Sequence, residues 1–129
     1  DEEFEEVLAR SILEHISHRQ IPYTLKEWYR ILTPGGTLEL ILPQVDAVFK
    51  CYTQGTMSLD EFWGYIWGDS DHSYNFHLCG FTTKIITKCL MDAGFVDVKF
   101  TDPFQYNQEL DPMSWEMRVL AKRPSSTFV

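Results

Sequence analysis

The feature that most constrains this sequence is a strand–helix–strand pattern in its first 42 residues. Residues 4–9 carry Val-Leu-Ala after an acidic start, which is typical of a short strand. Residues 22–32 place apolar side chains on one helical face, and residues 37–42 are almost all apolar or β-prone. A strand of the latter kind is usually buried on both faces, as in the middle of a parallel sheet. The pattern therefore predicts an α/β fold.

Capping and turn residues set the expected ends of the helix over 22–32. Thr24 and Glu27 have the spacing of a capping box, in which each side chain accepts a hydrogen bond from a backbone N–H group of the first turn. Pro34 is expected to end the helix, and Gly35-Gly36 to form the turn into the next strand. Because this glycine pair precedes a strand and does not open a helix, it is not a phosphate-binding loop.

The rest of the chain predicts five further elements around an insertion that spans about residues 44–77. These are a helix over 46–52, a helix capped by Ser58 and Glu61, a helix capped by Thr83 and ended by Gly94, and strands over 96–100 and 116–122. We expect Phe95 to pack against the last turn of the helix before it. The order of elements is consistent with a single partial domain over residues 1–129.

Three short motifs at these spacings resemble class I S-adenosylmethionine-dependent methyltransferases of the type 11 kind. They are Leu13-Glu14-His15, Pro34-Gly35-Gly36 and Ala93-Gly94-Phe95. The resemblance covers about residues 1–122 and corresponds to the C-terminal half of that family. It implies a partial Rossmann-like sheet with strands in the order 4-5-7-6, in which the seventh strand is antiparallel between the fifth and sixth. In the family, the glycine-rich cofactor loop and the ribose-binding acid lie before strand four, whereas this sequence begins in the turn that leads into that strand.

The resemblance also implies a cofactor and its contacts. Ala9, Arg10 and Ser11 follow the equivalent of strand four, where the family lines the methionine end of S-adenosylmethionine. Ligands of open α/β sheets lie beyond the carboxyl ends of the strands, which is the general reason for this placement. The alternative is that these residues form a strand end with no ligand.

The Leu-Glu-His triplet offers one candidate for proton transfer. His15 is a weak candidate for a catalytic residue, because imidazole exchanges protons near neutral pH. The alternative follows from the family, in which this triplet mostly orients the helix after strand four. Leu13 would then be a core residue, and Glu14 and His15 would form local hydrogen bonds or line the cleft.

Aromatic and polar residues near the end of the insertion predict a substrate lid. Insertions after strand five often cover the acceptor site in the family, and the lid candidates here are Trp67, His72, Tyr74 and His77. An equally strong alternative places residues of the preceding helix, such as Trp63 and Ile66, in a core stripe. Asp69, Asp71, His72 and His77 are of metal-ligating types but lack the spacing of a zinc motif, so no metal is expected.

Composition narrows the possible partners and the compartment. Eleven basic against 19 acidic residues give a net charge of −8, which argues against nucleic acid and anionic membranes as partners. No apolar run in the sequence is long enough to span a bilayer. Cys51, Cys79 and Cys89 are odd in number and form no Cys-x-x-Cys pair, as expected for reduced thiols in a cytoplasmic protein.

The resemblance implies transfer of a methyl group from S-adenosylmethionine to an unidentified acceptor. The sequence leaves two alternatives open: a non-catalytic remnant that acts through self-association or a protein partner, and a catalytic chain completed by a separate N-terminal piece. The DNA upstream of Asp1 distinguishes them, since an in-frame Gly-x-Gly segment would restore the enzyme. Because strand 5–9 would have no strand-one neighbour, we expect an exposed edge and a homodimer.

Overall fold

A computed structural model describes residues 3–71 and 75–125 and has the element order that the sequence predicts. His72 and Tyr74, two of the lid candidates, lie outside the described residues. The elements are β1 (Phe4–Arg10), the short 3-10 turn η1 (Leu13–His15), α1 (Ile21–Ile31), β2 (Leu32–Pro43), α2 (Val45–Thr53), α3 (Leu59–Trp67), α4 (Thr83–Asp92), β3 (Val96–Thr101) and β4 (Glu116–Lys122).

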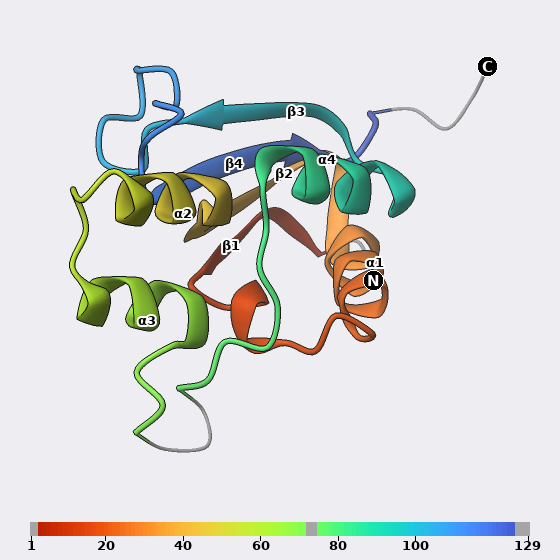
Figure 1. Cartoon of the computed structure of the whole chain (residues 1–129). Coiled ribbons are helices and arrows are strands. Elements are labelled where there is room, and N and C mark those ends of the chain that lie inside the picture. Colours follow the sequence, from red (N-terminus) through yellow and green to blue (C-terminus); the bar gives the residue numbers. More distant parts are fainter. Residues whose placement is uncertain (1–2, 72–74, 126–129) are drawn as a thin grey trace.

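The four strands form one mixed sheet in the order β1-β2-β4-β3 (Figure 1). β1 and β2 are parallel, whereas β4 is antiparallel to both of its neighbours, β2 and β3. This order and these directions are those of methyltransferase strands 4-5-7-6. The predicted α/β fold class and the partial sheet are therefore confirmed.

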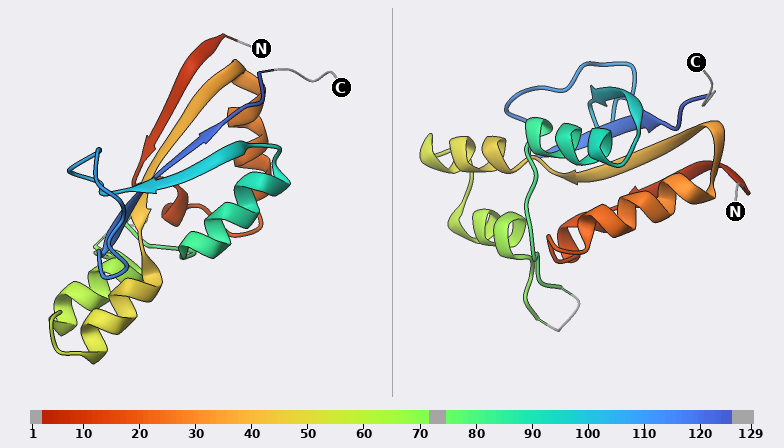
Figure 2. Two further views of the ribbon diagram at one scale, coloured as in Figure 1. Left: turned by 90° about the horizontal axis from the view of Figure 1, so that it is seen from above. Right: turned by 90° about the vertical axis from the view of Figure 1, so that its right-hand side faces the viewer.

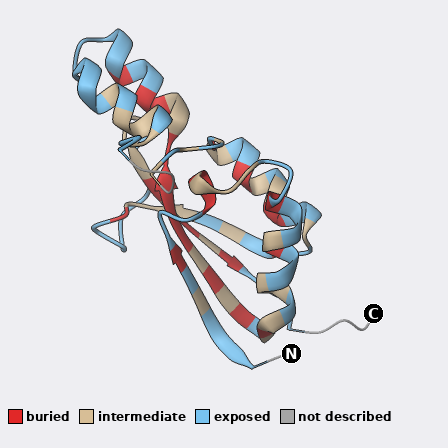
Figure 3. Cartoon of the chain, turned by 90° about the horizontal axis from the view of Figure 1, so that it is seen from below, coloured by how far each residue is buried: buried red, intermediate tan, exposed pale blue. Residues whose placement is uncertain are grey.

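The main core lies between the sheet and two helices. α1 and α4 cover the same face of the sheet (Figure 2), and buried residues alternate with less buried ones along much of β2 and β4 (Figure 3). Leu38, Leu40 and Leu42 of β2 meet this layer, and so do Met117, Val119 and Ala121 of β4. Each of the leucine, methionine and valine side chains contributes roughly 1.5–3 kcal/mol by leaving water, and the alanine methyl group less. The sheet is thereby held rigid up to the ends of its strands, where the candidate site lies.

The α2–α3 pair lies beyond the carboxyl ends of β1 and β2, clear of the main core (Figure 2). It has a second, smaller cluster made by Val48, Cys51 and Met57, with Phe62, Tyr65 and Ile66 packed against it. Trp63 is more than half exposed, so its placement in a core stripe was wrong, whereas Ile66 does pack in this cluster. The helix α3 begins with the predicted capping box of Ser58 and Glu61.

The start of α1 agrees with the predicted helix over 22–32 to within one residue, but the predicted capping box does not form. The helix begins at Ile21, three residues before Thr24, and Pro22 occupies its first turn. Proline is well suited to that position, because it lacks an N–H group that the helix would leave unpaired there. Glu27 pairs with Arg30 one turn later, with 2.9 Å from Nε to Oε2, so the predicted capping box is absent from α1.

The turn predicted at Gly35-Gly36 is a bulge inside β2. Phe4 pairs with Leu32 and Glu6 with Thr37, so the strand β2 loops out between these two pairs. Gly35 has a φ of +80°, a left-handed conformation that glycine adopts without strain. The helix α1 therefore passes directly into a strand that is longer than residues 37–42.

The helix α4 and the strand after it follow the prediction with two changes. Its N-cap is Thr82 and not Thr83, with the Thr82 hydroxyl accepting a hydrogen bond from the Ile85 N–H group. Gly94 has a left-handed φ of +105°, as predicted, and the Phe95 N–H group donates to the Leu90 carbonyl of the last turn. In β3, the pairing with β4 shifts register after Val96. The Val96 side chain is exposed, whereas the other apolar residues of the strand pack on the core.

Candidate functional site

The site begins where β1 ends. Ser11 has a φ of +55°, a left-handed conformation that costs a non-glycine residue roughly 1–2 kcal/mol. Its N–H group donates to the Ile41 carbonyl of β2 at 2.8 Å, which extends the pairing of the two strands by one residue. Backbone strain of this kind is often found at functional sites. The bend turns the chain into η1 directly beyond the carboxyl ends of both strands.

A distant segment, residues 76–81, runs alongside η1 (Figure 1). The Leu78 N–H group donates to the Glu14 carbonyl at 2.7 Å, and Nδ1 of His15 lies 3.0 Å from the Phe76 carbonyl oxygen. The Cys79 thiol donates to backbone carbonyls of η1 and the residue after it. Burial, reinforced by the nearby Glu14 carboxyl, raises the pKa of Cys79 to about 11. Cys79 is therefore a protonated hydrogen-bond donor that holds the two segments together.

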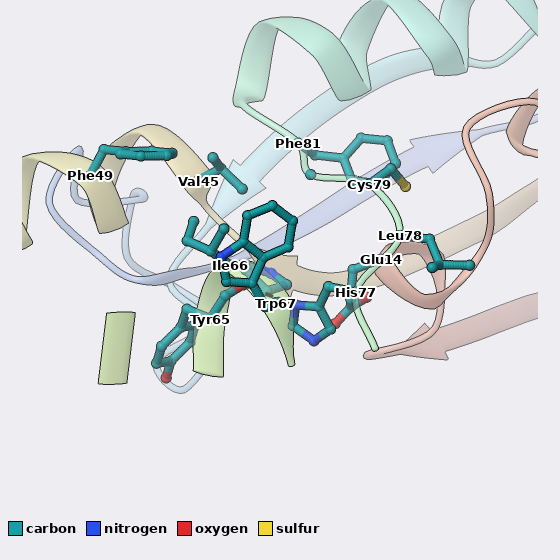
Figure 4. A pocket seen from close by; sticks show the side chains of 12 residues that line it. Glu14, Val45, Phe49, Tyr65, Ile66, Trp67, His77, Leu78, Cys79 and Phe81 are labelled. Carbon is teal, nitrogen blue, oxygen red and sulfur yellow. Dashed lines mark hydrogen bonds between the residues drawn. The ribbon is translucent and has the colours of Figure 1, made fainter. Parts of the chain in front are cut away.

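An apolar cavity of about 190 Å³ lies between this segment and the α2–α3 pair. Figure 4 shows Phe49, Ile66, Trp67 and Phe81 around it, with Glu14 and His77 at one end. The walls are aliphatic and aromatic, while the few polar groups gather on one side. This combination is typical of small-molecule sites, in which apolar walls exclude water and a few polar groups orient the ligand.

A more open and polar cleft of about 460 Å³ adjoins the cavity at the ends of β1 and β2. Glu14 and His77 line both spaces, so they lie at the junction between them. The cleft is acidic, with five carboxylate side chains among its lining residues, which are Ser11, Glu14, His15, Pro43, Asp60, Glu61, Gly64, Tyr65, Asp69, His77 and Glu116. Its charge favours a positively charged ligand.

Glu14 is the most unusual group of the junction. It is 2% exposed, and its Oε1 atom has no hydrogen-bond partner among residues 3–71 and 75–125. Burial raises the pKa of the Glu14 carboxyl; its own backbone N–H and His15 act in the opposite direction, while Glu116 raises it further. A buried carboxylate without a partner is costly, and such groups often mark functional sites.

Two histidines meet beside this carboxyl. The rings of His15 and His77 are in edge-to-face contact, with centroids 4.8 Å apart. Nδ1 of His77 lies 2.9 Å from the Tyr65 carbonyl oxygen. Burial lowers the pKa of His77, an effect that His15 reinforces and that the Tyr65 hydrogen bond and Asp69 oppose. His77 is accordingly more inclined to the neutral form, which can accept a proton or bind a metal ion.

The structure brings some of the sequence-predicted residues together and separates others. Ser11 and His15 line the polar cleft, and Trp67 and His77 line the apolar cavity. Ala9 is buried in the main core, so only its backbone can contact a cofactor. The cofactor-binding assignment of Ala9, Arg10 and Ser11 and the catalytic assignment of His15 stay predictions.

Several residues of the site carry no strong signal in the sequence. Glu14 was expected to orient η1 or line the cleft, but nothing in the sequence indicated its complete burial. Cys79 looked like an isolated thiol. The segment that carries His77 lies about 60 residues from η1 along the chain, and only the three-dimensional fold brings the two together.

Comparison with known proteins identifies the fold through solved structures alone. No protein-family model and no curated protein matches the sequence. A methyltransferase from Methanosarcina mazei matches with a TM-score of 0.63 and 18% identity over 98% of this chain and 62% of its own. A possible histamine N-methyltransferase from Thermotoga maritima matches with a TM-score of 0.64 and 16% identity over 95% and 57% of the two chains. Human N-acetylserotonin methyltransferase, solved with S-adenosylmethionine, matches with a TM-score of 0.61 and 15% identity over 93% of this chain and 29% of its own.

These likenesses place the chain in one structural class. It has the fold of the C-terminal half of class I S-adenosylmethionine-dependent methyltransferases, and it spans between 29% and 62% of the three solved chains above. Within its described residues, every helix is too short or too polar to cross a membrane.

Proposed function

We propose that this chain supplies the acceptor side, and part of the cofactor side, of an S-adenosylmethionine-dependent methyltransferase. The observation that carries the proposal is the junction of the polar cleft and the apolar cavity at the carboxyl ends of β1 and β2. In open α/β sheets, ligands bind beyond the carboxyl ends of the strands. The methyltransferase strand order of the sheet supports this assignment of the catalytic end of the strands.

The negative charge of the polar cleft suits the methionine end of the cofactor. That end carries a positive sulfonium, which supplies the methyl group, together with a positive amino group and a negative carboxylate, so its net charge is positive. The cleft is lined by carboxylates, including Asp60, Glu61 and Glu116. Opposite charges a few ångströms apart in a partly dry site attract one another by several kcal/mol before desolvation is counted. Backbone groups at Arg10 and Ser11 would fix the position of the methionine end at the strand terminus.

The apolar cavity is proposed to hold the acceptor. Its volume of about 190 Å³ suits a small apolar or aromatic group and not a large polar one. An acceptor seated there would present its nucleophilic atom to the junction, next to Glu14 and His77. A neutral His77 imidazole can take the proton that an oxygen or nitrogen acceptor loses on methylation. Trp67, at 60% exposure, would close over the bound group as part of the lid.

The affinity of this chain alone for S-adenosylmethionine tests the proposal that it supplies only part of the cofactor site. The glycine loop, the ribose acid and the residue after strand three of the family are absent from these 129 residues. Losing several hydrogen bonds of about 1 kcal/mol or more each weakens a micromolar site to about millimolar. Calorimetry with S-adenosylmethionine should therefore detect weak binding or none. A low-micromolar dissociation constant would show that the cofactor is held by contacts other than those proposed.

The second candidate function is self-association through the edge of β1. Among residues 3–71 and 75–125, β1 pairs only with β2, so its other edge presents unpaired backbone groups. Phe4 and Leu8 on this strand are 49% and 60% exposed. Two copies that pair these edges antiparallel would bury both features. An N-terminal half of the fold would cover the same edge, and in that case no dimer is needed.

Light scattering at micromolar concentration separates these two arrangements. A homodimer would have twice the chain mass of 15.1 kDa, and a Leu8→Lys variant would shift it toward the monomer. A folded monomer at all concentrations would remove self-association from consideration. We also propose a cytoplasmic location, in line with the three free cysteines.

A further inference from the structure

Three side chains at the junction can together offer ligands to a metal ion. Glu14, His15 and His77 each present one ligand atom, and these atoms all lie within 4.8 Å of one another. The first two come from η1, and the third comes from the segment that is hydrogen-bonded to it. We propose that these three residues form a binding site for a divalent transition-metal ion of the zinc type.

Both imidazole rings are oriented as metal-binding histidines usually are. Nδ1 of His15 faces the Phe76 carbonyl oxygen at 3.0 Å, and Nδ1 of His77 faces the Tyr65 carbonyl oxygen at 2.9 Å. A carbonyl oxygen only accepts hydrogen bonds, so each Nδ1 carries the proton. The lone pair of each neutral ring is then on Nε2, which is the arrangement that second-shell carbonyls impose on metal-bound histidines.

The buried carboxyl of Glu14 gives an independent reason for a cation. Oε1 of Glu14 is inaccessible to solvent and has no hydrogen-bond partner within the described part of the chain. A metal ion bound to this oxygen would supply both the missing partner and the missing counter-charge. The His15–His77 ring contact places the other two ligands next to the same carboxyl.

The ligand set selects the kind of ion. Two imidazoles and one carboxylate suit zinc, iron, cobalt or nickel, whereas magnesium and calcium prefer sites made of oxygen atoms. Metal–ligand bonds of about 2.1 Å in a tetrahedral site place ligand atoms roughly 3.4 Å apart. The three side chains must therefore close by about 1 Å, which small changes in their χ angles provide.

Three protein ligands leave one coordination position open, as in catalytic zinc sites. That position would lie at the junction of the cavity and the cleft, because Glu14 and His77 line both. Water, or an oxygen of an acceptor in the cavity, would fill it. The second possibility rests on the proposed methyltransferase function, whereas metal binding itself does not.

The test uses the whole chain after treatment with a chelator and its removal. Zinc chloride is titrated by calorimetry, and cobalt chloride by visible absorption, which reports coordination geometry. The informative variants are His15→Asn and His77→Asn, since Asn keeps a donor near the Nδ1 position and removes Nε2. His18→Asn is the matched control, because His18 is exposed on the turn before α1 and is not part of the cluster. Cys79→Ser tests whether a thiol contributes.

One equivalent of zinc should bind to the chain, to His18→Asn and to Cys79→Ser. Its affinity should fall more than about 10-fold in His15→Asn and His77→Asn, because even loss of a second-shell partner costs that much. Zinc should raise the melting temperature only of the variants that bind it. Binding that survives both substitutions, or that is lost equally in His18→Asn, would overturn the site. Failure to bind S-adenosylmethionine would leave this result untouched.

Discussion

Replacing Glu14 with Gln should stabilise the metal-free chain at pH 8 and have little effect at pH 4. Gln has nearly the same shape but no charge, and Glu14 is almost completely buried with an unpaired Oε1. Burial raises the pKa of the Glu14 carboxyl above its ordinary value of 4.5. The folded chain therefore holds this proton more tightly than the unfolded chain. The contribution of the protonated Glu14 carboxyl to stability is fully present below pH 4.5 and is lost as the pH rises through the folded pKa.

The expected gain at pH 8 is the free energy of ionising the Glu14 carboxyl in its buried position, about 1.4 kcal/mol for each unit by which folding raises its pKa. Between pH 4 and pH 8, the two proteins should differ in their free energy of unfolding by an amount that changes with pH. This change should not exceed about 1.4 kcal/mol per pH unit, which is the limit for a single proton. Urea unfolding between pH 4 and pH 8, with a chelator present, measures it. Two results would show that the ionised Glu14 carboxyl does not destabilise the folded chain. One is a difference in free energy of unfolding that does not vary with pH, and the other is a Gln variant that is less stable than the native protein at pH 8. With zinc present, the variant should instead lose the metal-dependent stabilisation.

Three further outcomes follow from local geometry. Ser58→Ala removes the side chain that accepts a backbone N–H at the start of α3 and should cost about 1 kcal/mol in urea unfolding. Gly68→Ala should destabilise more than Gly55→Ala, because both glycines have positive φ but only at Gly68 would a Cβ collide with the Asn75 carbonyl. At pH 8, Cys79 should react with iodoacetamide roughly 100-fold more slowly than in the unfolded chain, since its pKa is raised to about 11, as mass spectrometry of the labelled peptide can show.

Elements defined by local patterns were predictable from the sequence. The continuous apolar run of β2, the capping box of α3 and the Gly94 helix end each depend on residues close together in the chain. Their patterns, set beside the family motifs, were sufficient for the strand order as well. The errors were also local: the capping box predicted at Thr24 and Glu27 does not form in α1, and a bulge places the glycine pair within β2.

The site was only partly predictable, because it is made by contacts between distant segments. The Leu-Glu-His triplet indicated where the site lies, and Trp67 and His77 were chosen as lid residues. That His77 would meet His15, and that Glu14 would be buried between them, depends on how the segment after α3 returns to η1. Metal ligands were sought within one loop, where the spacing fits no motif. The cluster in the structure combines that loop with a turn about 60 residues earlier.

The proposed cofactor site at the carboxyl ends of β1 and β2 is tested most directly by NMR. Cofactor contacts are mapped on the isotope-labelled chain during titration with S-adenosylmethionine. We expect weak binding, with a dissociation constant on the order of 1 mM and shift changes concentrated in the amides of residues 9–16, at the carboxyl end of β1. Low-micromolar binding would contradict it. So would shift changes that, at millimolar cofactor, are confined to the opposite end of the sheet, around residues 34–36.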